Sequence, residues 1–287
     1  MASYPFVTLD VFTDTRFGGN PLAVFTDARG LTGDQMQALA AEMNLSETTF
    51  VLPPEDPANT ARVRIFNRTA EMPFAGHPSI GTGWVLSQMG RGTDLRLEVP
   101  AGIVGVEVTD HGATIAAPRP LSLGAELAVD VAAACASITP ADIVVTGHRP
   151  VEATVGVAFI FAEVTGEALT RAAPDLAAFR QAGDSDPAFG DRLSLHLYAR
   201  DGDTLRARMF APNSGTVEDP ATGSANATLA ALLLSLSGAE AGGWDIIQGV
   251  EMGRPSRLRA TARRAADGVR ATVGGGCVPV LRGEATV

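Results

Sequence analysis

The chain has 287 residues, of which 46% are hydrophobic and 19% charged, and its formal net charge is -10. This composition supports a large buried core and excludes a disordered or low-complexity chain. The 22 cationic side chains are all arginines that lie singly or in pairs, so neither nucleic acid nor an anionic membrane is an expected partner.

Several cofactor classes are excluded by residues that the sequence lacks. Without lysine, the chain forms neither a pyridoxal Schiff base nor a phosphate loop of the Gly-Lys-Ser/Thr type. The two cysteines and four histidines are far apart in sequence, and none has a zinc-binding spacing. We therefore expect no metal ion and no organic cofactor.

The sequence also contains no obvious targeting or membrane segment. The first residues lack a basic region followed by an apolar stretch, so no secretory signal is predicted and the cytoplasm is the expected location. The most apolar stretch, residues 225–236, contains Asn226, Thr228 and Ser235 and is shorter than the roughly 20 residues that cross a membrane. We expect it to form a buried helix.

In the first half of the chain, apolar and polar residues alternate between Gly, Asp and Pro, a pattern typical of short strands. Apolar residues with helical spacing predict an amphipathic surface helix at 32–43. A helix rich in small residues is expected at 77–89. The predicted strands are 7–13, 22–26, 49–52, 61–67, 95–99, 103–108 and 113–117.

The second half repeats this plan. An amphipathic helix is expected at 175–182, and a helix that is apolar almost all round at 224–236. Such a helix must be enclosed by other elements. The predicted strands are 143–146, 154–163, 193–198, 204–210, 250–252, 257–262, 269–273 and 278–282.

One tripartite string occurs twice. It reads R-x-F and then E-x-P-x-small-G-polar, and it runs from Arg64 to His77 and again from Arg208 to Ser224. The second E-x-P begins 147 residues after the first, which is about half the chain, as gene duplication would give. In each copy an extended segment leads through a Pro-Gly loop into an apolar helix.

These patterns predict an α+β fold of two pseudo-symmetric lobes, each a sheet that encloses a central helix. The Pro-rich stretch at 117–124 is the best boundary, which gives an N-terminal lobe of residues 1–118 and a C-terminal lobe of residues 119–287. Because the second lobe is longer by about fifty residues, we expect the last strand to return to the first lobe.

The starts of the two apolar helices are candidate anion sites, because unpaired N–H groups and the helix dipole point outward there. If the two starts face one cleft, the amides near Gly76, His77, Gly223 and Ser224 would hold a carboxylate or an enolate-like oxygen. Ordinary glycine-assisted helix starts are the alternative.

Three titratable residues accompany these helix starts. His77 is either a proton carrier or a simple helix cap. Asp219 precedes the second helix, where a plain N-cap carboxylate is the alternative. Glu47 enters a strand, where Glu is disfavoured; half-buried there it would be placed to shuttle a proton, whereas on a solvated edge it would not.

Five strings, in chain order, resemble the PhzF-like isomerase family of phenazine biosynthesis, which shares the fold of diaminopimelate epimerase. They are DVFT from Asp10, FGGNPLAV from Phe17, NLSE from Asn44, FAGHP from Phe74 and EDPATGSA from Glu218. The resemblance extends to GVEMGRPS from Gly249 and to the closing Arg282-Gly283-Glu284. It implies lobes built of a curved, mostly antiparallel sheet or barrel around a central helix, an active site in the cleft between them, and usually a homodimer.

The resemblance also implies roles for individual residues. Glu47 would be the acid and base, while His77 and Asp219 would bind the substrate by hydrogen bonds and assist the passage of the proton. The best-known reaction of the family isomerises a dihydro-hydroxyanthranilate, so a small carboxylate is the expected partner. Further side chains expected to line the cleft are Asn20, Ser46 and Asn213.

Two other activities stay open. The related epimerases use a cysteine at each helix start, where this chain has Ala75 and Thr222, so a thiol pair is not expected. A racemase or epimerase of a small amino or hydroxy acid would instead use Glu47 and His77 as opposed bases. A non-catalytic protein that binds a small carboxylate is the other alternative.

Overall fold

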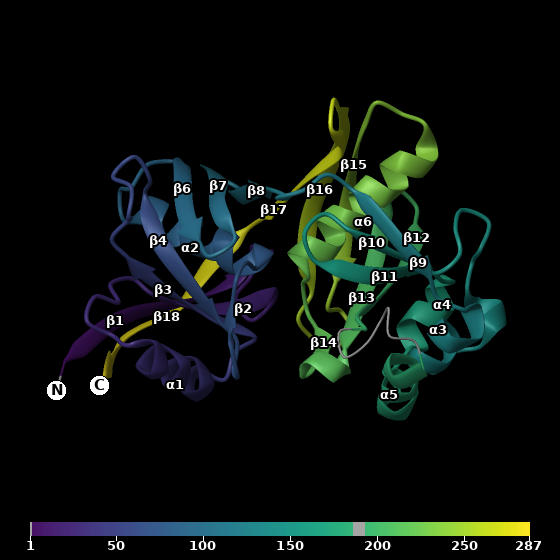
Figure 1. The fold of residues 1–287 in the computed structure, drawn as a ribbon, viewed down its shortest axis with the longest axis horizontal. Helices are drawn as coiled ribbons and strands as arrows, with labels where there is room; N and C mark the ends of the chain where they lie inside the picture. Colours follow the sequence, from purple (N-terminus) through teal and green to yellow (C-terminus); the bar gives the residue numbers. More distant parts are fainter. Residues whose placement is uncertain (1, 186–192) are drawn as a thin grey trace. The chain divides into compact units, whose positions relative to one another are not determined.

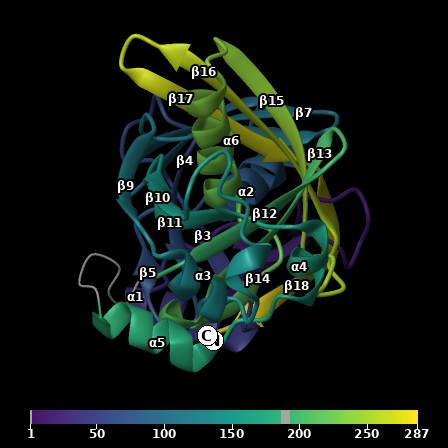
Figure 2. The same cartoon turned by 90° about the vertical axis from the view of Figure 1, so that its right-hand side faces the viewer.

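The computed structural model describes residues 2–185 and 193–287. The chain divides into unit 1, residues 1–116 and 274–287, and unit 2, residues 117–273. The division lies just before the predicted boundary at 118, and the segment from Gly274 onward belongs to unit 1. In that unit the backbone N–H of Ala2 donates to the carbonyl of Val287 at 3.0 Å, and the two ends of the chain lie side by side (Figures 1 and 2).

Nine strands lie in the part of unit 1 that the structure describes: β1 (Ser3–Val11), β2 (Asn20–Phe25), β3 (Glu47–Leu52), β4 (Ala61–Phe66), β5 (Glu71–Met72), β6 (Asp94–Val99), β7 (Gly102–Thr109), β8 (Gly112–Ala116) and β18 (Cys277–Thr286). Eight of them pair in the order β18–β1–β2–β3–β4–β6–β7–β8, and β5 pairs with the end of β4. The pairs β2–β3 and β4–β6 are parallel, and the others are antiparallel.

The described residues of unit 2 also form nine strands: β9 (Ser122–Glu126), β10 (Val151–Thr154), β11 (Ala158–Glu163), β12 (Leu195–Asp201), β13 (Thr204–Ala211), β14 (Thr216–Asp219), β15 (Ala241–Gln248), β16 (Ser256–Ala265) and β17 (Gly268–Gly275). Their order is β9–β10–β11–β12–β13–β15–β16–β17, with β14 at the end of β13. Here β11–β12 and β13–β15 are the parallel pairs.

The two units therefore have the same strand order and the same two parallel pairs, which confirms the duplicated α+β plan. The registers agree in detail, because Ile65 pairs with Met72 in unit 1 and Met209 pairs with Asp219 in unit 2. The edge strand differs in origin. In unit 2 it is β9, the first strand of the unit along the chain, whereas in unit 1 it is β18, which comes from the far end of the sequence.

Each unit has one enclosed helix, α2 (Gly76–Gln88) in unit 1 and α6 (Gly223–Ser237) in unit 2, and each runs among the strands of its own unit (Figure 1). Both begin one residue before the predicted position. Glycines let α2 approach the sheet, since a Cβ on Gly81 would lie 2.6 Å from Leu22 Cδ2, and one on Gly83 would lie 2.6 Å from Val106 Cγ1. A larger residue at either position would require the contacted side chains on the strands to move.

The predicted surface helices are confirmed as α1 (Gly33–Met43) and α5 (Leu176–Ser185). Thr32 and Gln35 form a capping box at the start of α1, and Asn44 ends it in a left-handed conformation. The short elements α3 (Val129–Cys135), α4 (Gly166–Arg171), η1 (Pro140–Asp142) and η3 (Pro212–Ser214) were not predicted. Within the described ranges, every helix is too short or too polar to cross a membrane.

The hydrophobic core of each unit has a second part beneath its surface helices. In unit 1, α1 covers Phe25, Phe50 and Phe66, and the rings of Phe25 and Phe50 stack at 4.8 Å. In unit 2, the helices α3, α4 and α5 cover strand residues that include Leu195 and Phe210. The central helix and these surface helices thus pack against opposite faces of each sheet.

Three strand predictions in the second half were wrong. The single strand at 154–163 is two strands, because a turn with Gly156 at φ 156° interrupts the apolar run. At 143–146, only Ile143 forms an isolated bridge, to Val164. Residues 250–252 form a turn between Gly249 and Gly253, which have φ values of 77° and 69°.

Candidate active site

Glu47 is the first residue of β3 and lies beside Leu22 of the parallel strand β2. The chain reaches it through the left-handed Asn44, whose N–H donates to the carbonyls of Ala40 and Ala41. Its side chain is only 17% exposed. The carboxylate is therefore held at a strand start, mostly shielded from water, and the solvated edge position is excluded.

The neighbouring Ser46 is fixed by a second predicted residue. Its hydroxyl donates to the side-chain oxygen of Asn20 at 2.9 Å, and Asn20 is fully buried at the start of β2. Two of the residues predicted to line the site are thus in contact, one residue away from Glu47. This contact holds the segment between α1 and β3 against the end of β2.

His77 is the second residue of α2 and is 5% exposed. Its Nδ1 lies 3.2 Å from Oε2 of Glu47, so the structure brings these two predicted residues together. Burial lowers the pKa of His77 to about 3, against the opposing effect of a backbone hydrogen bond with Pro21. The imidazole is therefore neutral at neutral pH, and it lies against the carboxyl group as an uncharged ring rather than as a cation.

The first turn of α2 offers backbone donors beside this pair. Ala75 precedes the helix in an extended conformation and makes no side-chain cap. Pro78 has no N–H, and the N–H of Ser79 donates to the carbonyl of Ala75. The amides of Gly76 and His77 lie in the first turn, where an N–H has no acceptor within the helix.

The equivalent turn of unit 2 contains Asp219, Gly223 and Ser224. Asp219 ends β14 and is 8% exposed, and its Oδ2 accepts a hydrogen bond from the hydroxyl of Thr222 at 2.5 Å. Gly223 begins α6, and Ser224, the partly buried second residue, occupies the place that His77 has in α2. These three predicted residues therefore share one helix start. Asn213 lies apart, since its side chain donates to the carbonyl of Phe179.

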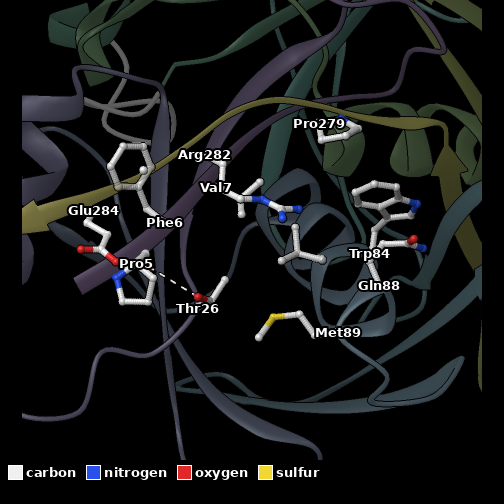
Figure 3. Close-up of a pocket in the computed structure, with 12 residues that line it drawn as sticks. Pro5, Phe6, Val7, Thr26, Trp84, Gln88, Met89, Pro279, Arg282 and Glu284 are labelled. Carbon is white, nitrogen blue, oxygen red and sulfur yellow. Dashed lines mark hydrogen bonds between the residues drawn. The ribbon is translucent and has the colours of Figure 1, made fainter. Parts of the chain in front are cut away.

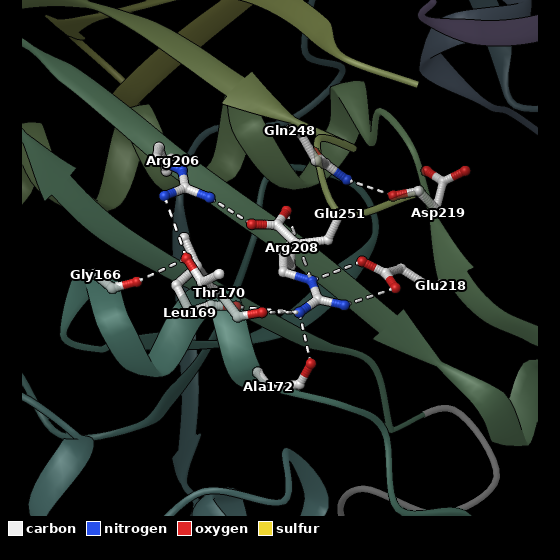
Figure 4. A network of polar contacts seen from close by, with 10 residues as sticks. All are labelled: Gly166, Leu169, Thr170, Ala172, Arg206, Arg208, Glu218, Asp219, Gln248 and Glu251. Atoms are coloured by element: carbon white, nitrogen blue, oxygen red, sulfur yellow. Dashed lines mark hydrogen bonds and ion pairs between the residues drawn. The ribbon is translucent and has the colours of Figure 1, made fainter. Parts of the chain in front are cut away.

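Sequence reasoning missed Gln248, the last residue of β15, which fixes the turn before α6 (Figure 4). Its Nε2 donates to the carbonyl of Asp219 at 2.8 Å and to the hydroxyl of Thr222 at 3.1 Å. Its Oε1 accepts from the N–H of Thr222 at 3.2 Å and from Nδ2 of Asn226 at 2.7 Å. The side chain is 1% exposed, so these bonds are shielded from water. A Gln before a Gly gives no recognisable sequence signal of this role.

The strand pair that leads to Asp219 is held by a buried arginine (Figure 4). Arg208 donates to both carboxylate oxygens of Glu218 at 2.8 and 2.9 Å, and its Nη1 donates to the carbonyls of Leu169 and Ala172. In unit 1, Arg64 and Glu71 form the same two-pronged pair at 2.7 and 2.6 Å. The repeated R-x-F and E-x-P strings therefore supply the same Arg-Glu ion pair in both units.

The residues that precede the two helices cannot supply thiols. Ala75 precedes Gly76 and Thr222 precedes Gly223, while the two cysteines lie elsewhere in the fold. Cys135 is in α3 and its burial raises the pKa of the thiol to about 12, and burial also raises the pKa of Cys277. Neither thiol lies at the start of a central helix, and neither is ionised at neutral pH as a thiolate base would be.

Known proteins match almost the whole chain. The family model described as phenazine biosynthesis-like protein (PhzC-PhzF) matches residues 9–283. An uncharacterised isomerase of Mesorhizobium japonicum is 38% identical over 280 residues, which cover 90% of each chain. The trans-2,3-dihydro-3-hydroxyanthranilate isomerase of Pseudomonas chlororaphis is 38% identical over 288 residues, 97% of this chain and 98% of its own. A crystal structure of a PhzF-family protein from Bacillus anthracis has a TM-score of 0.89 at 22% identity, with all of both chains covered, which is a likeness of fold.

Proposed function

Because the chain belongs to the phenazine biosynthesis-like PhzC-PhzF family and is an isomerase, we propose that it moves a proton within a small carboxylated substrate, with Glu47 as the acid and base. The observation that supports this proposal is the contact between a shielded carboxyl group and a neutral imidazole, at 3.2 Å between Glu47 Oε2 and His77 Nδ1. No metal or organic cofactor takes part in the proposed reaction.

Glu47 removes a proton from one carbon of the substrate and returns it to another. One carboxyl group performs both steps when the two carbons lie on the same side of it. His77 adapts to both states of Glu47. An ionised Glu47 accepts a hydrogen bond from Nδ1–H, and a protonated Glu47 donates to Nδ1 when the imidazole carries its proton on Nε2. The neutral ring thereby stabilises each state without adding a charge.

In this proposal, the first turn of each central helix is a donor site for a carboxylate group. Amides of Gly76 in α2 and of Gly223 and Ser224 in α6 are donors of the kind that bind a carboxylate or stabilise a developing enolate oxygen. Asp219 acts with them as a hydrogen-bond partner of a substrate donor group. The side chain of Asp219 is fixed by a hydrogen bond from Thr222, and its backbone carbonyl is fixed by a hydrogen bond from Gln248.

The proposed substrate is a small cyclic carboxylate with an acidic C–H bond. Relatives named trans-2,3-dihydro-3-hydroxyanthranilate isomerase supply the first trial substrate. A racemase with opposed thiol bases is not supported, because Ala75 and Thr222 stand at the two helix starts.

The test is deuterium incorporation from D₂O into trans-2,3-dihydro-3-hydroxyanthranilate or its product, followed by NMR. The wild-type chain is expected to incorporate deuterium, and Glu47→Gln to do so about 10²- to 10⁴-fold more slowly, the usual contribution of a general base. Glu42→Gln, an exposed glutamate on α1, is the matched control and should match wild type.

Equal incorporation by wild type and Glu47→Gln would remove Glu47 from the mechanism. Should the wild type leave this substrate unchanged, the same assay with a panel of cyclic amino and hydroxy carboxylates separates a wrong substrate from a wrong mechanism. A mechanism without Glu47 is then indicated only if the wild type converts one of these substrates and Glu47→Gln converts it at the same rate.

A further inference from the structure

Unit 1 contains a pocket that is separate from Glu47 and His77. A pocket of about 670 Å³ lies against β1, β18 and the C-terminal half of α2 (Figure 3). Its lining residues on α2 begin at Trp84, whereas His77 is in the first turn. At 1.5 Å per residue, the distance from His77 to Trp84 along the helix axis is roughly 10 Å. The pocket therefore does not share the proposed catalytic groups.

The walls of this pocket are mainly apolar. The helix contributes Trp84 and Val85, its C-cap contributes Met89, and the two strands contribute Val7 and Pro279. Met89 is 52% exposed, so an apolar side chain remains in contact with water at the pocket wall. The volume lies within the roughly 300–1,000 Å³ of small-molecule sites, which combine apolar walls with a few polar groups.

Arg282 supplies the charged group. Its side chain lines the pocket together with Trp84 and Val7 (Figure 3), and it has no carboxylate or hydrogen-bond partner within residues 2–185 and 193–287. The other charged lining residue is Glu284, whose carboxylate already accepts a hydrogen bond from the hydroxyl of Ser3 at 2.6 Å. One cation is thus available to a ligand, beside an indole ring.

We propose that this pocket binds a small planar monocarboxylate, with its ring against Trp84 and its carboxylate on Arg282. An apolar ring replaces water at the walls, and a guanidinium recognises a carboxylate through paired N–H donors. A dianion is disfavoured, because Glu284 lies in the same pocket and only one guanidinium faces the ligand. The proposal is independent of the proposed isomerase mechanism, since none of its residues belongs to that site.

The experiment uses Trp84 as a local reporter. The chain has two tryptophans, so Trp244→Phe leaves Trp84 as the only source of indole emission. Benzoate is expected to change this emission in a saturable manner, and neutral benzamide to bind about twofold to fivefold more weakly, the range for one exposed charge pair. Arg282→Gln should lose the preference for benzoate over benzamide, while Arg29→Gln, an exposed arginine paired with Asp27, should keep it.

A crystal soaked with 4-bromobenzoate provides a second readout that does not depend on fluorescence. Anomalous bromine density beside Trp84, with the carboxylate on Arg282, supports the proposal. Equal binding of benzoate and benzamide would overturn the proposal, and so would an unchanged preference for benzoate in Arg282→Gln. The proposal is also overturned if light scattering shows a dimer and the Trp84 emission of that dimer does not respond to benzoate. The last result would assign this face to a second copy of the chain.

Discussion

Ser194 occupies in unit 2 the position that Glu47 occupies in unit 1. Each residue directly precedes a strand residue that pairs with the phenylalanine of the repeated R-x-F string, since Thr48 pairs with Phe66 and Leu195 pairs with Phe210. The duplication therefore kept the strand and its register, but only one copy has a carboxyl group there. His77 and Ser224 differ in the same way at the helix starts.

This relationship predicts that only the first copy of the position carries proton transfer. Glu47→Ser, which introduces the side chain that unit 2 already accommodates, should lower kcat about 10²- to 10⁴-fold with an unchanged fold. Ser194→Ala should change kcat less than about threefold. Steady-state kinetics with circular dichroism as a folding check would decide this, and comparable losses in both variants would contradict the asymmetry.

The second prediction concerns the dependence of stability on pH. Burial lowers the pKa values of His77 and His196 from 6.5 to about 3, so the folded chain keeps both rings neutral where the unfolded chain protonates them. The contribution of the two neutral rings to the free energy of unfolding should therefore be fully present above pH 6.5 and decrease as the pH falls toward 3. Between pH 6.5 and 5 the expected loss is about 2 kcal/mol for each histidine.

Urea unfolding at several pH values measures this loss. His77→Gln should remove about half of the slope between pH 6.5 and 5, whereas His111→Gln, on an exposed turn, should leave it unchanged. A flat profile in the wild-type chain over this range would mean that the rings are hydrated or that they titrate in the folded state.

The third prediction compares the two copies of the Arg-Glu pair. The side chain of Arg208 is 7% exposed, and that of Arg64 is 27% exposed. Arg208→Leu leaves Glu218 and the carbonyls of Leu169 and Ala172 without a buried donor, so the free energy of unfolding should fall by about 3–5 kcal/mol. Arg64→Leu breaks a half-exposed pair and should cost about 1 kcal/mol or less. Similar urea midpoints for the two variants would contradict this reading of their environments.

The sequence predicted the parts of the fold that the repeat and the periodicity define. The starts of α2 and α6 were placed within one residue, because Pro, Gly and an apolar run coincide there in both copies. The edge strand β9 was missed, since all five of its residues are exposed and no alternation marks it. The strand β15 was missed because Gly242 and Gly243 interrupt its apolar pattern.

The candidate site was predictable only in part. Glu47 and His77 each stood out in the sequence, but their contact arises because β3 and α2 pack together across an interval of about thirty residues. The role of Gln248 could not be predicted from the sequence, because it depends on the direction that the chain takes at Gly249. A Cβ at that glycine would lie 2.5 Å from the carbonyl oxygen of Pro220, so the turn brings the end of β15 against the start of α6.

The position of β18 at the edge of unit 1 has a consequence for biosynthesis. On the ribosome, the strands of unit 2 are complete once β17 has emerged, and each then has its neighbour available. Ser3–Val11, although translated before the other described strands, has an unpaired edge until Cys277–Thr286 leaves the exit tunnel. β1 therefore stays without this neighbour while the rest of the two units is made, and during that interval its unpaired edge is open to pairing with another chain.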